Sequence, residues 1–285
     1  MGKLHRVRRK MGSPAISAGL LLMISVGAAA AVEVPAKGKS VAIDRIKGSG
    51  TLRAGVAAAL PWLGQNPSSH EFFGPSIEMG QELANLLGVK LELVPSGYDV
   101  IIAGLQANQF DITIAALSAT EKRKEVVDFV NYTLAGTCYA VLKDNAKVNT
   151  LEDLNQPAVS IGTWNGTGTE QVVKAKYTKA TLNSVVMPVP GSNRMEEVLA
   201  KRIDAATLDS PRALLVVHQF PQLKIIPGGP DYCIRNPDVP VPIGIAITKG
   251  DPEFRSWLEA VIAQMQGKID AAIEKYSSLE YMLPK

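Results

Sequence analysis

Histidine, cysteine and aromatic residues are scarce in this sequence. Its 285 residues include three histidines and two cysteines, and 6% of them are aromatic. No stretch matches a zinc-ligand spacing, a Gly-x-Ser-x-Gly nucleophile motif or a nucleotide-binding glycine fingerprint. His70 has Glu71 beside it, but in a polar loop a solvated pair is the simpler interpretation. We therefore expect no enzyme activity and no cofactor or metal.

An excess of positive charge and long apolar runs are lacking outside the N-terminus. Residues 1–10 contain five Lys and Arg residues and no acid, residues 16–26 are mostly apolar, and residues 27–31 are all small. This order predicts a secretory signal peptide over residues 1–31 and a periplasmic location for the rest. The alternative is a single membrane anchor, but the apolar run is short for spanning.

The chain that remains after cleavage has no excess of positive charge. The full sequence has 30 basic and 27 acidic residues, so loss of five basic residues changes the net charge from +3 to −2. Nothing then favours nucleic acid as a partner. Cys138 and Cys233 both lie in the exported part. An oxidising compartment permits a disulfide between them, with two buried thiols as the alternative.

Alternating strand and helix patterns predict an α/β fold. The length exceeds that of a usual single domain, so two lobes are expected. Strands that alternate with helices imply βαβ units and parallel sheets. Strands are expected at 51–57, 90–94, 111–116, 137–142, 159–162, 185–189, 204–209, 223–226 and 243–248, and helices at 76–87, 100–107, 170–177, 193–202 and 269–276, with one more beginning at 251–252.

Residues 111–129 hold the first candidate binding group. The expected strand ends in a polar turn at residues 118–120, and Arg123 follows within a charged run. Ligands of open α/β sheets bind beyond the carboxyl ends of the strands, and an arginine fork matches a carboxylate. Taken alone, this pattern is explained more simply as a solvated charge run. Whether Arg123 belongs to a binding site therefore depends on the rest of the chain.

The second half of the chain offers two further groups. Strand 159–162 runs into a Gly/Thr turn that opens helix 170–177, where free backbone N–H groups suit an anion. Asp209 ends the strand that Asp204 opens, as Ser118 ends the strand after Asp111. We interpret this as one unit used twice, in two similar lobes, with the two strand-opening aspartates bonding local backbone. An arginine, a helix N-terminus and an aspartate together suit a free amino acid.

From about residue 50 to residue 276 the sequence resembles the extracytoplasmic amino-acid-binding receptors of ABC importers, solute-binding protein family 3. The segments that carry the resemblance are TEKR at 120–123, VDF at 127–129, LEDL at 151–154, GTG at 166–168, LDSP at 208–211, IGIA at 243–246 and KGDP at 249–252. Each is weak alone, but their order and spacing are specific. The glycine-lysine turn usual before the strand-opening aspartate is absent here, and ANQFD at 107–111 replaces it.

The resemblance implies a type II periplasmic-binding-protein fold with two similar α/β lobes and a two-strand hinge. Lobe 1 would comprise residues 48–132 plus 244–285, and lobe 2 residues 137–239. Cys138 and Cys233 would then share a lobe, which favours the disulfide. The partners implied are a free amino acid and the membrane permease of an ABC importer, with the receptor itself a monomer.

The resemblance also assigns roles in lobe 1. Arg123 would clamp the ligand carboxylate, Ser118 would supply a hydroxyl, and Ala116 would offer its backbone carbonyl to the ammonium group. Trp62, on a loop after the first strand, would lie against the ligand side chain, although plain packing is as good an explanation.

In lobe 2, Thr167 and Gly168 would give N–H or hydroxyl bonds to the ligand, Asp209 would pair with the ammonium group, and Trp164 would reach the side chain. Residues 57–60 lack the acid that relatives often carry, which argues against a basic ligand. The two tryptophans favour an apolar or aromatic side chain.

Two rival functions remain open. The same fold hosts periplasmic dehydratases of the cyclohexadienyl type, which need a general acid in the cleft, here Glu170 or Glu78. A sensor that binds amino acids without transport is the second rival, and the sequence does not separate it from an importer component.

Overall fold

The computed structural model describes residues 1–2, 32–66, 68–186 and 194–282. The signal peptide expected at residues 1–31 therefore lies almost wholly outside the described residues. The described part from residue 32 onward belongs to one compact unit. Within it, no helix combines the length and the apolar character that crossing a membrane requires.

Lobe 1 is built on a parallel sheet of three strands in the order β4-β1-β5. These strands are β1 (Thr51–Val56), β4 (Lys90–Pro95) and β5 (Ile112–Thr113). The helices of this lobe are α1 (Val41–Ser49), α2 (Pro75–Leu87), α3 (Ile101–Gln106), α4 (Glu121–Lys124) and the long α9 (Pro252–Ser277). A small hairpin of β2 (Gly64–Gln65) and β3 (Phe72–Phe73) lies between β1 and α2.

A seven-stranded sheet has the order β6-β12-β7-β10-β8-β9, and β11 also pairs with β7. Lobe 2 is built on the part of this sheet from β7 to β9, together with β11. Its own strands are β8 (Ser160–Trp164), β9 (Thr181–Val185), β10 (Ala205–Asp209) and β11 (Leu223–Ile226). Its helices are α5 (Gly168–Lys176), α6 (Arg194–Leu199), α7 (Ala213–Gln219) and α8 (Pro230–Arg235), with short 3-10 turns at Glu152–Leu154 and Ser210–Arg212.

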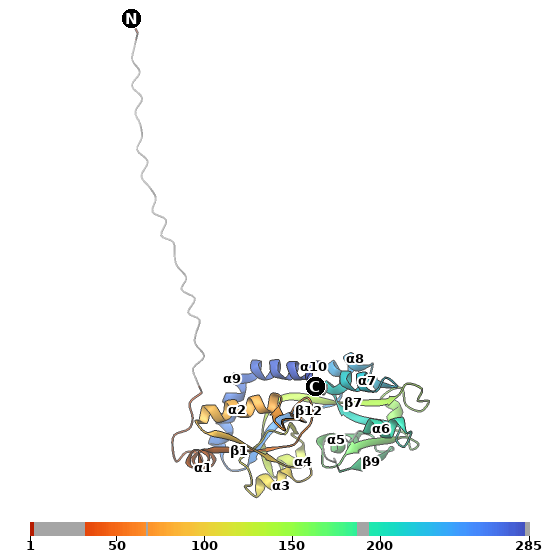
Figure 1. The fold of residues 1–285 in the computed structure, drawn as a ribbon, viewed down its shortest axis with the longest axis horizontal. Coiled ribbons are helices and arrows are strands. Elements are labelled where there is room, and N and C mark those ends of the chain that lie inside the picture. The colour runs from red at the N-terminus through yellow and green to blue at the C-terminus, as the bar shows by residue number, and fades with distance from the viewer. Residues whose placement is uncertain (3–31, 67, 187–193, 283–285) are drawn as a thin grey trace. The chain divides into compact units, whose positions relative to one another are not determined.

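Two long antiparallel strands join the lobes (Figure 1). They are β7 (Val127–Leu142) and β12 (Asp238–Thr248), and their register shifts between Asp238 and Val241 and again between Ile243 and Gly244. The second shift lies where β6 (Leu117–Ser118) pairs with β12. The chain ends in α10 (Leu279–Met282), which follows α9 and contacts α7 of lobe 2.

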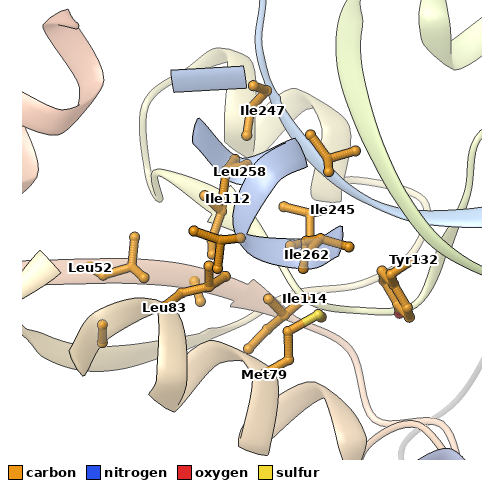
Figure 2. Close-up of a cluster of buried hydrophobic side chains, with 14 of the residues drawn as sticks. Leu52, Met79, Leu83, Ile112, Ile114, Tyr132, Ile245, Ile247, Leu258 and Ile262 are labelled. Atoms are coloured by element: carbon orange, nitrogen blue, oxygen red, sulfur yellow. The ribbon is translucent and has the colours of Figure 1, made fainter. Parts of the chain in front are cut away.

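Separate hydrophobic clusters support the two lobes. In lobe 1, apolar side chains from β1, α2, β5, β12 and α9 converge in one buried cluster (Figure 2). Leu83 of α2 and Ile112 of β5 are fully buried there. Burial of one such side chain stabilises the fold by about 1.5–3 kcal/mol. Lobe 2 has its own clusters around Cys138 and around Tyr139.

The two strand-opening aspartates hold equivalent positions in the lobes. Asp111 accepts a hydrogen bond from the backbone N–H of Arg53 at 2.9 Å, and Asp204 accepts one from the backbone N–H of Ser160 at 2.9 Å. Each therefore bonds to the backbone of the neighbouring parallel strand, which confirms the local role predicted for both.

The structure places Cys138 of β7 and Cys233 of α8 in a disulfide, with their Cα atoms 6.1 Å apart. Both sulfurs are buried in the lobe 2 cluster. The bridge ties α8 to the strand that continues into lobe 1.

Four elements differ from the sequence-based expectation. The strand expected at 185–189 is replaced by β9, which ends at Val185, and residues 187–189 lie outside the described residues. The strand expected at 137–142 begins at Val127, because β12 pairs with the first part of β7, from Val127 to Thr137. The two C-terminal helices expected are one helix, α9, since buried contacts outweigh the roughly 1 kcal/mol that Gly267 costs inside a helix. The strand expected at 111–116 is interrupted, and Ala116 has a φ of 50° between β5 and β6.

Candidate functional site

A cavity of about 880 Å³ lies between the lobes. Lobe 1 contributes residues 57–60, 96–99, 116, 118 and 123, and lobe 2 contributes residues 164, 165, 167–169, 194, 207–209 and 212. The connecting strands supply its floor at residues 135–137, 241 and 243. Of the eight expected ligand-binding residues, seven line this cavity: Ala116, Ser118, Arg123, Trp164, Thr167, Gly168 and Asp209.

Arg123 is held in place by both lobes. The side chain of Thr120 caps α4, which fixes the start of the helix that carries Arg123. The guanidinium donates from Nη1 to the carbonyl of Ser118 at 3.0 Å and from Nη2 to the carbonyl of Gly166 at 2.8 Å. Burial lowers the pKa of Arg123, but an arginine stays charged at neutral pH. Its remaining N–H groups are available to an anion in the cavity.

The backbone turn at Ala116 carries the chain past the cavity wall. Its φ of 50° lies in the left-handed region, which costs a residue with a side chain roughly 1–2 kcal/mol. The hydroxyl of Tyr98 donates to the carbonyl of Ala115 at 2.8 Å and so secures this turn. Burial raises the pKa of Tyr98, which therefore stays neutral.

The N-terminus of α5 faces Ser118 across the cleft. Thr167 caps the helix by accepting from the N–H of Glu170 at 3.1 Å, and Glu170 accepts from the N–H of Gly166 at 2.8 Å. A Cβ on Gly168 would lie only 2.2 Å from the Cβ of Ser118. Glycine is thus what allows the helix end to approach lobe 1 so closely, and the N–H groups of a first helical turn suit an anion.

Asp209 supplies the opposite charge at the end of β10. Burial raises its pKa, and the charge of Arg212 and a hydrogen bond from Trp62 only partly oppose that rise. The indole Nε1 of Trp62 donates to Asp209 Oδ2 at 3.3 Å. Trp62 is 2% exposed and is not among the lining residues. It supports Asp209 from behind, while Trp164 of β8 does line the cavity.

Among the lining residues that sequence reasoning missed are Tyr98, Arg194 and Arg212. Arg194 lies over the ring of Trp164, 5.3 Å from its centroid, and Arg212 follows Asp209 by three positions. The short distance from Asp209 along the chain was a usable signal for Arg212. No local pattern marks Tyr98 or Arg194.

The two glutamates considered as general acids are not lining residues. Glu170 is engaged at the start of α5. Burial raises the pKa of Glu78, but hydrogen bonds from Tyr276 and Lys275 outweigh it and hold that pKa below its usual value. Within the described part of the chain, no group of His, Cys, Asp and Glu side chains is arranged to hold a metal ion.

The chain resembles proteins that bind amino acids. It is 25% identical over 261 residues to the L-cystine-binding protein TcyJ of Escherichia coli K12, which covers 90% of this chain and 94% of that protein. The crystal structure of the ancestral amino acid-binding protein AncCDT-1, a precursor of cyclohexadienyl dehydratase, matches with a TM-score of 0.69 and 34% identity over 83% of this chain and 99% of that one.

A third match is a putative binding component of an ABC transporter from Wolinella succinogenes DSM 1740, complexed with lysine. Its TM-score is 0.70 and its identity 28%, over 82% of this chain and 98% of that one. Residues 52–278 match the family of bacterial extracellular solute-binding proteins, family 3. With most of the described chain inside that match, and with a two-lobed fold and an interlobe cavity, this chain belongs to the bacterial extracellular solute-binding proteins, family 3.

Proposed function

We propose that this protein is a periplasmic receptor that binds a free amino acid between its lobes and delivers it to the permease of an ABC importer. The observation that supports this most is that Arg123 and Asp209, which carry opposite charges, line the same cavity. The buried Arg123 attracts a carboxylate, and the half-buried Asp209, whose pKa is raised, gains from a cation beside it. An α-amino acid carries both groups on one carbon.

The other lining groups complete the proposed site. The α-carboxylate would lie between Arg123, the hydroxyl of Ser118 and the N–H group of Gly168. Thr167, whose N–H and hydroxyl both donate to the carbonyl of Trp164, would hold the start of α5 in place. The α-ammonium would lie between Asp209 and the carbonyl of Ala116. Each charge of the ligand would then meet partners from both lobes, so binding would favour the closed cleft.

Closure would occur about the connecting strands. We assign lobe 1 to residues 48–132 plus 244–285, lobe 2 to residues 137–239, and the hinges to the stretches between them. The register shifts of β12 against β7 lie in this region, and irregular pairing lets a strand bend.

Thermal unfolding of residues 32–285 with each common amino acid tests the proposal. A ligand present at 100 times its Kd adds about 2.7 kcal/mol to the free energy of unfolding by mass action. For a chain of this size that raises Tm by roughly 5–10 °C. The shift should be lost in Arg123→Ala and in Asp209→Ala. Arg235→Ala is the matched control, because Arg235 is exposed on α8 and lies outside the cavity. No shift with any amino acid would refute the proposal.

A dehydratase of the cyclohexadienyl type is the rival, since AncCDT-1 is a precursor of that enzyme. Such an enzyme needs a protonated acid beside its substrate. Glu170 and Glu78 lie outside the cavity lining, and the lowered pKa of Glu78 keeps it ionised. Conversion of a prephenate-like substrate to an aromatic product with loss of water and carbon dioxide, measured by absorbance, would decide for the rival. A receptor that senses without transport would bind alike but fail to support uptake with its permease.

A further inference from the structure

Arg212 is a charged group for which the described residues provide no hydrogen bond. It ends the turn Ser210–Arg212 after β10, and its side chain lines the cavity. Its Nε is buried and has no hydrogen-bond partner. Among the described carboxylates none forms an ion pair with it, and Asp209 acts on it only through its charge. A half-buried guanidinium with a buried, unpaired N–H costs free energy that an anion beside it would recover.

Arg194 is a second such group, on the same lobe. Only 4% of it is exposed, its Nη2 donates to the carbonyl of Asn183 at 2.6 Å, and its Nε is buried without a partner. A Cβ on Gly162 would lie 2.3 Å from Nη2, so glycine is needed to admit the guanidinium. The ring of Trp164 supports it from the other side. The side chain is thus fixed at the wall of the cavity.

The charged side chains that line the cavity carry a net positive charge, which a zwitterionic ligand with a neutral side chain would leave unbalanced. The lining residues include three arginines, at 123, 194 and 212, and two aspartates, at 99 and 209. The excess is one positive charge, and Asp99 is exposed, which weakens its share. A neutral amino acid leaves this excess, a cationic one doubles it, and an acidic one cancels it. Poor solvation inside a cleft strengthens these differences.

The main-chain groups of the ligand leave both additional arginines unused. Under the proposed function, Arg123 takes the α-carboxylate and Asp209 takes the α-ammonium, so Arg194 and Arg212 remain for the side chain. The aromatic wall expected from the two tryptophans is also reduced, because Trp62 lies behind Asp209 and Trp164 carries Arg194 on its face. The cavity volume of about 880 Å³ leaves room for a side chain longer than that of aspartate.

We propose that Arg212 and Arg194 form a second anion subsite on lobe 2, and that the ligand is an amino acid whose side chain ends in a carboxylate. This inference rests on the proposed function and narrows it from amino acids in general to acidic ones. The proposed preference for an acidic ligand would distinguish this chain from the relative whose structure is complexed with lysine.

Isothermal titration with matched ligands tests the subsite. Glutamate and 2-aminoadipate are the acidic probes, glutamine is the neutral isostere of glutamate, and lysine is the cationic probe. Wild type should bind one of the acidic probes about 100-fold more tightly than glutamine or lysine, because a hydrogen bond to a charged group is worth about tenfold more in affinity than one to a neutral amide at each of the two arginines. This comparison needs no variant, so it does not depend on how a mutant folds.

Two variants then locate the subsite. Arg212→Gln should weaken binding of the acidic probe by about 10- to 150-fold while glutamine affinity changes less than about threefold. Arg194→Gln should act in the same direction, and Arg235→Gln should change neither. Arg123→Ala should abolish binding of all probes alike, which separates the two anion sites.

The outcomes distinguish this inference from the proposed function. If wild type binds neutral or cationic amino acids as tightly as acidic ones, the acidic specificity is wrong and amino-acid binding stands. If acidic probes bind best but neither arginine variant alters the preference, the subsite is wrong. If no amino acid binds at all, the proposed function fails, and the inference fails with it.

Discussion

Replacement of Gly168 by alanine should hold the two lobes apart. The added Cβ would lie 2.2 Å from the Cβ and 2.4 Å from the Oγ of Ser118. Carbon atoms in contact are about 3.5–4.0 Å apart, so the cleft must widen there by roughly 1.3–1.8 Å. Because Ser118 belongs to β6 and Gly168 opens α5, this widening separates the lobes and does not merely shift one side chain.

The cost follows from the bond that widening breaks. The hydrogen bond from Arg123 Nη2 to the carbonyl of Gly166 measures 2.8 Å and crosses the same gap. An increase of more than 1 Å removes it, and a hydrogen bond to a charged group contributes about 1.5–3 kcal/mol. We therefore expect Gly168→Ala to weaken ligand binding by about 10- to 150-fold, because each 1.4 kcal/mol is tenfold in Kd.

Titration calorimetry measures this loss, and small-angle scattering reports whether the ligand still makes the molecule more compact. Gly267→Ala is the control, since a Cβ there meets nothing within 4 Å on the exposed side of α9. That variant should bind normally and gain up to about 1 kcal/mol of stability from helix propensity. A Gly168→Ala protein that binds within twofold of wild type would show that this approach of the lobes does not belong to the bound state.

Three further predictions follow. Asp209→Asn should raise the Tm of the ligand-free protein at neutral pH and abolish amino-acid binding. Burial raises the pKa of Asp209 in the folded state. The stability that wild type gains from the protonated acid is therefore fully present below about pH 3.9 and is lost as pH rises through the folded-state pKa. The Tm difference between Asp209→Asn and wild type should accordingly vanish in acid. The Kd of wild type should increase as pH falls through that same raised pKa, because protonation of Asp209 removes the partner of the ammonium group. This increase should begin at a higher pH than an ordinary aspartate would give. Replacing Cys138 and Cys233 together by alanine should lower the free energy of unfolding by about 2–4 kcal/mol in urea titrations and leave Kd unchanged, because the bridge spans 95 residues within lobe 2; an unchanged unfolding midpoint would contradict this.

The residues that sequence reasoning found share one property. Ser118, Arg123 and Asp209 stand at or just after the ends of strands, and in an open α/β sheet that position alone places a side chain at the ligand edge. Thr167 and Gly168 begin a helix directly after a strand, which is equally visible in the chain. Alternation and helix signals likewise predicted most of the βα units.

The residues that it missed depend on contacts between distant segments. Arg194 is buried because Gly162, in another strand, makes room for it and Trp164 supports it. Tyr98 reaches the cavity because its hydroxyl bonds the carbonyl of Ala115. The extents of β7 and α9 were misjudged for a similar reason, since pairing with β12 and burial against lobe 1 override what local composition indicates. Only the folded chain brings these groups together.

The charged groups that line the cavity destabilise the ligand-free fold. Asp209 and Arg212 are each burdened by burial, which raises the pKa of the acid and lowers that of the arginine, and their mutual attraction does not offset it. Residues selected only for stability would be apolar at these positions. The proposed ligand would bring an ammonium group to the acid and a carboxylate to the arginine, so both charges would gain a partner as the lobes closed. The free energy that these two charges cost the ligand-free fold would then contribute to binding, and recognition of the ligand would be coupled to closure.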